Sequence, residues 1–361
     1  MKKSILLFYL FIIALFTIII SCNKDEQEYE TISKTSPVKA DLALVPYQKL
    51  TDYNFFDGEI KNLSPVYGLI PYQPTSELFS DYAQKKRFVW LPKNTKATYQ
   101  GDSKILDLPI GAVLVKNFYY TKLQPSNTTK IIETRVMIKK ETGWIFAEYI
   151  WNDNQTEAFL QTQSTSTNLS FLDDNNSVKN IVYKTPAAID CVKCHGTISG
   201  DKNPIGIKPQ NLNSNFSYAD GLKNQLSKLI EFGYLTNNLP NNIISVVDSK
   251  DISKPLELRV RSYFDINCAH CHNDNGDANH YGLNFEFEKT SNIENMGVGL
   301  QAEHYVAGFN GRIIASGNVA QSILYYRMNT ETDINFRMPQ IGRTIKDEKS
   351  VQLVSDWINS L

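Results

Sequence analysis

Alternation of apolar and polar side chains marks the first half of the chain. In residues 131–139 two sets of side chains alternate. One set is Ile132, Thr134, Val136 and Ile138, and the other is Glu133, Arg135 and Met137. A period of two is typical of a half-buried β-strand. Aromatic and β-branched segments also occupy residues 112–120 and 144–151, and residues 139–143 have the length of a hairpin connection. Residues 46–185 are therefore predicted to be rich in β-structure.

The pattern becomes helical further along the chain. Leucine and isoleucine recur at spacings of three and four in residues 221–234, and apolar residues recur in the same way in residues 255–264. In residues 346–361 the apolar side chains fall on one helical face, formed by Val351, Val354, Trp357, Ile358 and Leu361. These spacings predict three helices.

The N-terminal residues have a different character. Lys2 and Lys3 precede an apolar run over residues 5–20, which predicts an export signal. The run is about sixteen residues long, short of the roughly 20 that a membrane-spanning helix needs. Its end, Ile19-Ile20-Ser21-Cys22, resembles the lipobox of bacterial lipoproteins. This resemblance implies a signal peptide over residues 1–22, a lipid on Cys22 and anchoring to the cell envelope, at the periplasmic face or the outer-membrane surface. An uncleaved anchor is the alternative.

Composition limits the partners and the organisation. The chain has 361 residues, 21% of them charged, and a formal net charge of -1. The sequence therefore has no excess of basic residues that would predict a nucleic-acid partner. Its length is enough for two domains. The polar residues 23–45 are expected to form a flexible tether.

The cysteines carry the clearest chemistry. Apart from Cys22, all of them fall in two five-residue motifs, CVKCH at residues 191–195 and CAHCH at residues 268–272. Cys-x-x-Cys-His is the attachment sequence of haem c, in which two thiols bond to the porphyrin and the histidine ligates the iron. The motifs therefore predict two covalently bound haems, attached through Cys191, Cys194, Cys268 and Cys271 and ligated by His195 and His272.

Zinc and a redox disulfide are the alternatives for these motifs. A zinc ribbon has its two Cys-x-x-Cys pairs roughly 15 to 20 residues apart, whereas 73 residues separate Cys194 from Cys268. A redox pair is expected at a helix start in a thioredoxin-like unit, and no such unit is predicted here. Both alternatives are disfavoured.

The C-terminal part resembles the class I cytochrome c domain. Residues 255–361 contain, in order, a helix, the CAHCH motif, the sequence Met338-Pro339 and a terminal helix. The resemblance implies that Met338 is the second iron ligand of this haem, with Met328 as the nearby competitor. Arg312 and Arg327 are candidates for pairing with haem propionates.

Residues 65–196 resemble the β-sheet mono-haem cytochromes that oxidise hydroxylamine or bind nitric oxide. The resemblance implies an open position at the first iron, and Lys116 is the best candidate for a lysine–haem cross-link, although a solvated strand lysine is the simpler interpretation. If the first iron has a second protein ligand instead, the candidates are Met137, His280, Met296 and His304.

The whole chain resembles a family of exported di-haem cytochromes that are largely conserved hypotheticals. The predicted fold is an α+β multidomain protein, with an N-terminal β-sandwich-like domain that carries the first haem site, followed by an all-α class I cytochrome c domain. The predicted domains are 46–185 (β-rich), 186–254 (first haem segment with a helical cover) and 255–361 (cytochrome c). The expected function is electron transfer with an unidentified redox protein. The alternatives are a haem enzyme acting on a small nitrogen or oxygen species at the first haem, and a lipoprotein that uses haem for folding or for sensing nitric oxide.

Overall fold

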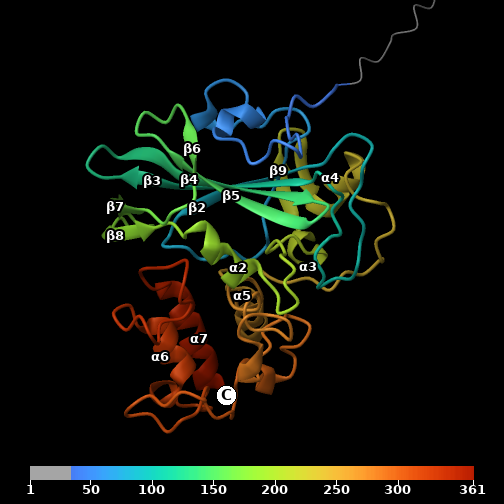
Figure 1. Cartoon of the computed structure of the whole chain (residues 1–361). Coiled ribbons are helices and arrows are strands. Elements are labelled where there is room, and N and C mark those ends of the chain that lie inside the picture. Colours follow the sequence, from blue (N-terminus) through green and yellow to red (C-terminus); the bar gives the residue numbers. More distant parts are fainter. Residues whose placement is uncertain (1–33) are drawn as a thin grey trace, which may run out of the picture. The chain divides into compact units, whose positions relative to one another are not determined.

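One antiparallel sheet dominates the protein. The computed structural model describes residues 34–361. The main sheet has eight strands, in the order β1-β2-β3-β4-β5-β6, and β7 pairs with β3 and β8 (Figure 1). The strands are β1 (Ile70–Tyr72), β2 (Gln84–Trp90), β3 (Val113–Leu123), β4 (Thr128–Lys140), β5 (Gly143–Trp151), β6 (Ala158–Gln161), β7 (Ser166–Leu172) and β8 (Val178–Lys184).

The strands predicted from the alternation are confirmed. Residues 112–120, 131–139 and 144–151 correspond to β3, β4 and β5. The predicted hairpin is present as well, because Lys140 pairs with Gly143 across the turn between β4 and β5. Gly143 has φ +103°, a backbone conformation that glycine adopts without strain.

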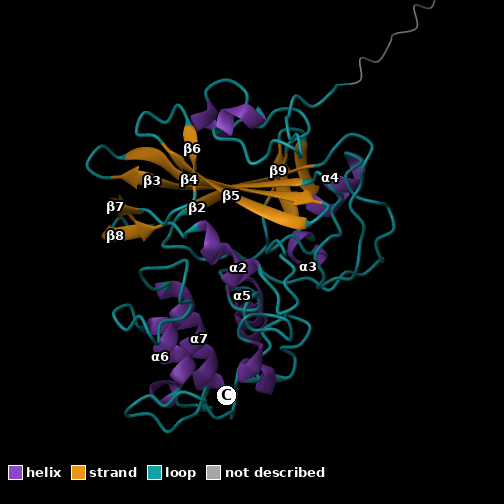
Figure 2. Cartoon of the chain, viewed as in Figure 1, coloured by secondary structure: helices purple, strands orange, loops and turns teal. Residues whose placement is uncertain are grey.

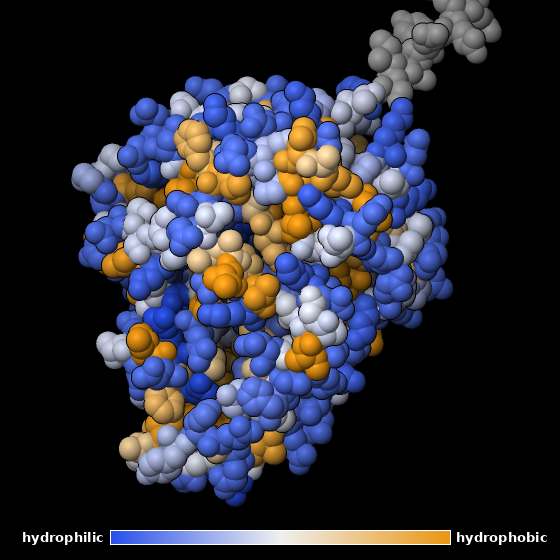
Figure 3. All heavy atoms as spheres, in the orientation of Figure 1, coloured by the Kyte–Doolittle hydropathy of each residue, from blue (hydrophilic) through white to orange (hydrophobic). Residues whose placement is uncertain are grey.

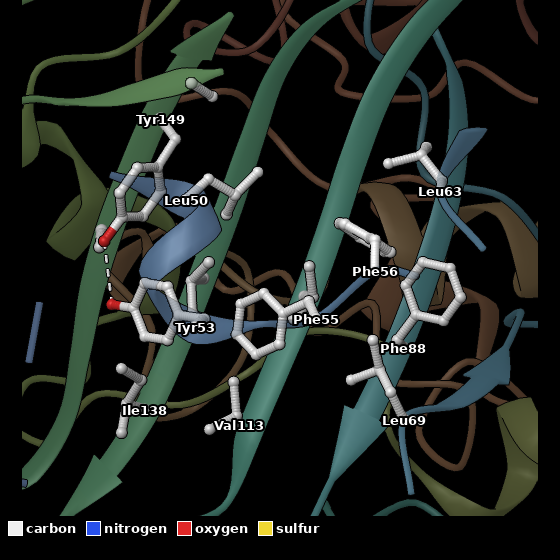
Figure 4. Packing of buried hydrophobic residues seen from close by; sticks show 14 of the residues in the cluster. Leu50, Tyr53, Phe55, Phe56, Leu63, Leu69, Phe88, Val113, Ile138 and Tyr149 are labelled. Atoms are coloured by element: carbon white, nitrogen blue, oxygen red, sulfur yellow. Dashed lines mark hydrogen bonds between the residues drawn. The ribbon is translucent and has the colours of Figure 1, made fainter. Parts of the chain in front are cut away.

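The first face of the sheet carries the largest aromatic core. The preceding segment, which includes the 3-10 helices Leu50–Tyr53 and Ile60–Asn62, packs its aromatic residues onto β3, β4 and β5. Figure 4 shows Tyr53, Phe55 and Phe56 laid across the strands, with the Tyr53 hydroxyl 2.9 Å from that of Tyr149. Tyr53 and Tyr149 are fully buried, and this hydrogen bond satisfies polar atoms that burial would otherwise leave unpaired.

The second face of the sheet is covered in part by a small α/β layer. This layer contains α3 (Pro209–Leu212), β9 (Asn215–Tyr218), β10 (Gly221–Asn224) and α4 (Gln225–Glu231). The helix predicted over residues 221–234 is therefore shorter than expected. It begins after Asn224, whose side chain accepts hydrogen bonds from the backbone N–H groups of Leu226 and Ser227 and so caps the helix.

Three α-helices lie in residues 256–361: α5 (Leu256–Asn267), α6 (Ile323–Asn329) and α7 (Glu348–Ser360). The predicted helices at 255–264 and 346–361 are confirmed as α5 and α7. Phe264 of α5 is fully buried between Phe285, with ring centroids 4.8 Å apart, and Trp357 of α7, at 6.2 Å. Aromatic packing of this kind holds α5 and α7 together.

The predicted fold class is wrong. The structure is mainly β: helices of all kinds account for 21%, the six described α-helices are short, and no all-α cytochrome c domain is evident in the described residues. Between α5 and α6 the described chain forms turns and three 3-10 helices, Asn279–Tyr281, Ile293–Met296 and Val319–Gln321. The N-terminal part has one eight-stranded sheet, so a sandwich of two large packed sheets is also wrong. Figure 2 shows how much of the region around α5, α6 and α7 is loop.

Residues 36–361 belong to one compact unit. The sheet lies above the C-terminal helices, with α2 (Cys191–His195) between them (Figure 1). The surface is hollowed below α2, between the sheet and the C-terminal helices (Figure 3). In residues 34–361 no helix combines the length and the hydropathy that crossing a membrane requires. The predicted signal peptide and lipidation site at Cys22 lie outside the described residues.

Candidate functional site

The CVKCH motif forms α2, a single helical turn that follows β8. The Lys193 ammonium lies 2.8 Å from the Asp190 carboxylate, one turn earlier, which stabilises the turn. The Nδ1 atom of His195 lies 2.7 Å from the carbonyl oxygen of Asn203. This is the contact expected of a metal-ligating histidine, because it fixes the ring and leaves Nε2 for the metal. The His195 ring also packs on Phe146 of β5, with centroids 4.8 Å apart.

The CAHCH motif begins immediately after α5. Cys268 caps that helix through its backbone N–H, which donates to the carbonyl of Phe264. The His272 ring packs edge to face against Phe285, with ring centroids 5.4 Å apart. Its Nδ1 atom is buried and has no hydrogen-bond partner in the described chain, so the backbone contact expected for both histidines is present only at His195.

Burial keeps both candidate iron ligands neutral. The pKa of His195 is lowered to about 4 and that of His272 to about 4, in each case mainly because burial disfavours the charged ring. A neutral imidazole is the form that binds a metal. Both histidines are therefore in their ligating form at neutral pH.

The two motifs touch each other although they are far apart in the sequence. The Cys194 and Cys271 sulfurs and a ring nitrogen of His270 lie within 4.8 Å of one another. The Cys271 thiol donates to the Lys193 carbonyl at 3.4 Å. A hydrogen bond from Cys271 lowers the pKa of Cys194 to about 4, whereas the pKa of Cys271 is raised by the same contact.

A large cavity lies beside each motif. The first cavity has a volume of about 1350 Å³ with its mouth included, and Cys191, Cys194 and His195 line it against the second face of the sheet. The second cavity has about 1280 Å³ and is lined by Cys268, Cys271 and His272. Both volumes include space that is open to solvent, so the enclosed part of each cavity is smaller.

The cavities share walls. Cys194, Asn267, His270, Pro339 and Ile341 line both of them. The side chain of Asn267 accepts a hydrogen bond from Phe79 N and donates one to the carbonyl of Glu77, which fixes the end of α5 to the segment before β2. Groups bound in the two cavities would therefore be neighbours.

Met338 and its predicted competitor Met328 both line the second cavity, and so does His304. Met137 of β4 lines the first cavity. The other two alternatives for the first iron do not lie there: Met296 is fully buried in the helical core, and His280 is exposed and lines neither cavity. Of the two predicted propionate partners, Arg327 lines the second cavity and Arg312 does not.

Lys116 lies in the first cavity, half-buried on β3, with its ammonium 4.7 Å from the centre of the Phe118 ring. Its side chain is therefore only partly exposed to solvent. The pKa of Lys116 is lowered well below its usual value, first by burial and then by its neighbours Arg87 and Arg135. The cation has no acidic partner within ion-pair distance in residues 34–361.

The sequence reasoning missed two parts of this site. His270 was treated as a variable position of its motif, yet it reaches both cavities. The alternation in β4 gave its charged residues no role, yet Glu133 is fully buried and binds Arg135 through two hydrogen bonds of 2.9 and 2.7 Å. A signal was available in β4, because a strand that carries Glu and Arg two positions apart can pair them on one face.

No family model, curated protein or solved structure matches this chain. The function is therefore inferred from the site alone. The residues around both cavities fit a covalent haem, since each cavity has two cysteines, a neutral histidine and walls that are mainly apolar. The Cys194, His270 and Cys271 cluster, in contrast, meets the requirements of a thiolate metal site for zinc or copper.

Proposed function

We propose that this protein is an exported di-haem c-type cytochrome that transfers electrons. The observation that carries the proposal is the contact between the two Cys-x-x-Cys-His motifs, each of which borders its own cavity. Haem c supplies one-electron redox chemistry. Because electron tunnelling falls steeply with distance, two redox groups fixed to touching cysteines would exchange electrons readily.

The protein's own residues would set the properties of the two sites. His195 is held by the Asn203 carbonyl, whereas His272 has only ring contacts. In the second cavity Met338 offers a thioether, a soft ligand that raises the reduction potential of iron. The two sites would therefore have unequal potentials, with electrons resting on the second.

The cysteine and histidine cluster supports a second candidate, a zinc or copper centre. Cys194, His270 and Cys271 supply two sulfurs and a nitrogen within 4.8 Å, a set that binds these metals. Such a centre leaves the first cysteine of each motif, and both large cavities, without a role. The two candidates exclude each other, because thioether bonds to a porphyrin consume the same two thiolates.

A haem enzyme is a third candidate, and Glu148 favours it. This buried carboxyl lines the first cavity, its Oε1 atom has no hydrogen-bond partner in the described chain, and burial raises the pKa of Glu148 to about 10. A protonated acid at this position could supply a proton to a small oxygen or nitrogen species. Met137 in the same cavity opposes this candidate, because a bound thioether would close the open iron position.

The decisive experiment is the intact mass of the protein purified from a host that attaches haem c. The expected mass exceeds that of the mature chain by two haems, and Cys191→Ala and Cys268→Ala should each lose most attachment at their own motif. Val192→Ala is the matched control, because it changes a variable position of the first motif. Absence of covalent haem, together with bound zinc or copper, would favour the metal centre instead.

A spectroscopic experiment separates electron transfer from catalysis. Carbon monoxide added to the reduced protein binds an iron only where a position is open or weakly held. Binding at the first haem alone supports an accessible site there, and Met137→Ala should increase it if that thioether competes. If neither haem binds carbon monoxide, the enzyme is excluded and simple electron relay stands.

A further inference from the structure

Three cations lie side by side on the sheet face that forms the wall of the first cavity. Arg87 of β2 is the direct partner of Lys116 on β3, and Lys116 is the direct partner of Arg135 on β4. All three line the cavity. Arg87 is 6% exposed, so it is among the most buried charged side chains of the described chain.

Only one of these cations has its charge balanced. Arg135 is bound by Glu133 through two hydrogen bonds, and Glu148, the partner of Arg135 on β5, is held in its neutral form by burial. In residues 34–361 no acidic side chain lies within ion-pair distance of Arg87 or Lys116. Two neighbouring cations, Arg87 buried and Lys116 half-buried, are costly without a counter-charge, because burial removes water and nothing replaces it.

The neighbouring row of the same sheet face is apolar. Leu114, Met137 and Phe146 are partners across β3, β4 and β5, two residues along the strands from the cations. The two rows are thus about 7 Å apart. Phe146 packs against the ring of His195, so the apolar row is next to the candidate iron ligand and the cationic row lies beyond it.

We propose that Arg87 and Lys116 form a site for the two carboxylates of the porphyrin attached at Cys191 and Cys194. This inference rests on the proposed function. A porphyrin is apolar over most of its ring and carries two carboxylates at one edge, which matches an apolar row followed by two unbalanced cations. Arginine and lysine are the side chains that pair with carboxylates most strongly.

A free small oxyanion, such as nitrite, would satisfy the same chemistry. The porphyrin is the better match, because it supplies two negative charges for two cations and its attachment point lies in the same cavity. A small anion would leave the apolar row uncovered. The experiment that follows distinguishes the porphyrin carboxylates from a free oxyanion.

The test compares Arg87→Gln and Lys116→Gln with Lys86→Gln in the intact holoprotein. Lys86 is the matched control, since it is exposed, adjacent to Arg87 on β2 and points to the other face. The measurements are the haem count by mass, the reduction potential of each haem and the propionate bending bands in the resonance Raman spectrum. Arg87→Lys keeps the charge and tests the site if Arg87→Gln does not fold.

Both cavity variants are expected to keep two haems, to shift the potential of the first haem to more negative values and to move its propionate bands. Lys86→Gln should do neither, and Arg87→Lys should retain most of the wild-type behaviour. Propionate bands and potentials that match those of Lys86→Gln overturn the proposal. So does saturable nitrite binding by the wild type that Arg87→Gln abolishes with the propionate bands unmoved. A wild-type mass without haem overturns both this inference and the proposed function, whereas two haems with unmoved bands overturn this inference alone.

Discussion

Replacing Asp81 should separate the sheet from the C-terminal segment that carries Met338. Asp81 lies between β1 and β2 and is 3% exposed. Its carboxylate accepts hydrogen bonds from Thr344 N at 2.6 Å, Thr344 Oγ1 at 2.8 Å and Ile345 N at 3.1 Å. These bonds join residues more than 260 positions apart in the sequence, just before α7.

The loss of stability expected for Asp81→Ala follows from these three hydrogen bonds. Each hydrogen bond contributes about 0.5–1.5 kcal/mol net, and a buried N–H without an acceptor costs about 1–3 kcal/mol. Removal of a buried charge offsets part of this loss. The free energy of unfolding is expected to fall by about 3 kcal/mol, out of the ~5–15 kcal/mol typical of a folded domain.

Urea denaturation followed by fluorescence measures this loss, and the midpoint should fall by about 1 M or slightly more. The matched control is Asp174→Ala, which removes the 2.8 Å ion pair with Lys349 between the same two parts of the chain. That pair is exposed, so its loss should cost less than about 0.5 kcal/mol. If the two variants are equally stable, Asp81 does not join these segments.

Asp81→Asn adds a pH dependence to the test. An amide can accept from the two backbone N–H groups and donate to the Thr344 hydroxyl, so the hydrogen bonds survive. Burial raises the pKa of Asp81 above its usual value. The stability that the acid contributes is therefore complete below its unfolded pKa and is lost as pH rises through the folded pKa. Asp81→Asn should gain stability relative to wild type over that same rise in pH, and an unchanged difference between the two proteins would contradict the raised pKa.

Three further predictions concern the candidate ligand, the helical core and the anchor. Met338→Ala should abolish the weak sulfur-to-iron absorption band of the oxidised protein, whereas Met328→Ala should leave it; the reverse result would exchange the two assignments. Trp357→Ala should lower the free energy of unfolding by about 3–5 kcal/mol, because it leaves a cavity beside Phe264, and a loss below 1 kcal/mol in urea denaturation would show that the core collapses to fill it. Cys22→Ala should move the protein from the membrane fraction to the soluble exported fraction, and continued membrane association would point to an uncleaved anchor.

The sequence predicted individual elements better than their arrangement. Alternation located β3, β4 and β5 because one face of each strand packs on an apolar core. The same alternation cannot distinguish a polar face in water from a polar face in a cavity, so it does not predict that Arg135 lines the first cavity or that Glu133 is buried. The period and polarity of a strand indicate which of its faces packs on the apolar core. Whether the second face of the sheet is also buried depends on α2 and the C-terminal segment, which are remote in the sequence.

The order of motifs also misled the fold prediction. A helix, a Cys-x-x-Cys-His motif, a Met-Pro pair and a terminal helix follow one another as expected, and α5 and α7 are present. That order says nothing of the residues between Asn267 and Ile323, where the described chain has turns and short 3-10 helices in place of an α-helix. Similarly, the 73 residues between Cys194 and Cys268 gave no reason to expect that the motifs touch.

The shared walls of the two cavities make this chain poorly modular. Pro339 and Ile341, from the C-terminal part, line the cavity of the first motif, while Lys193 and Cys194 line that of the second. A deletion that removed either motif with its surroundings would open the other cavity to water. Recombination between such proteins would therefore have to exchange both centres together. Shortening the chain to a protein with one centre would require new side chains on the cavity wall that the deletion exposes.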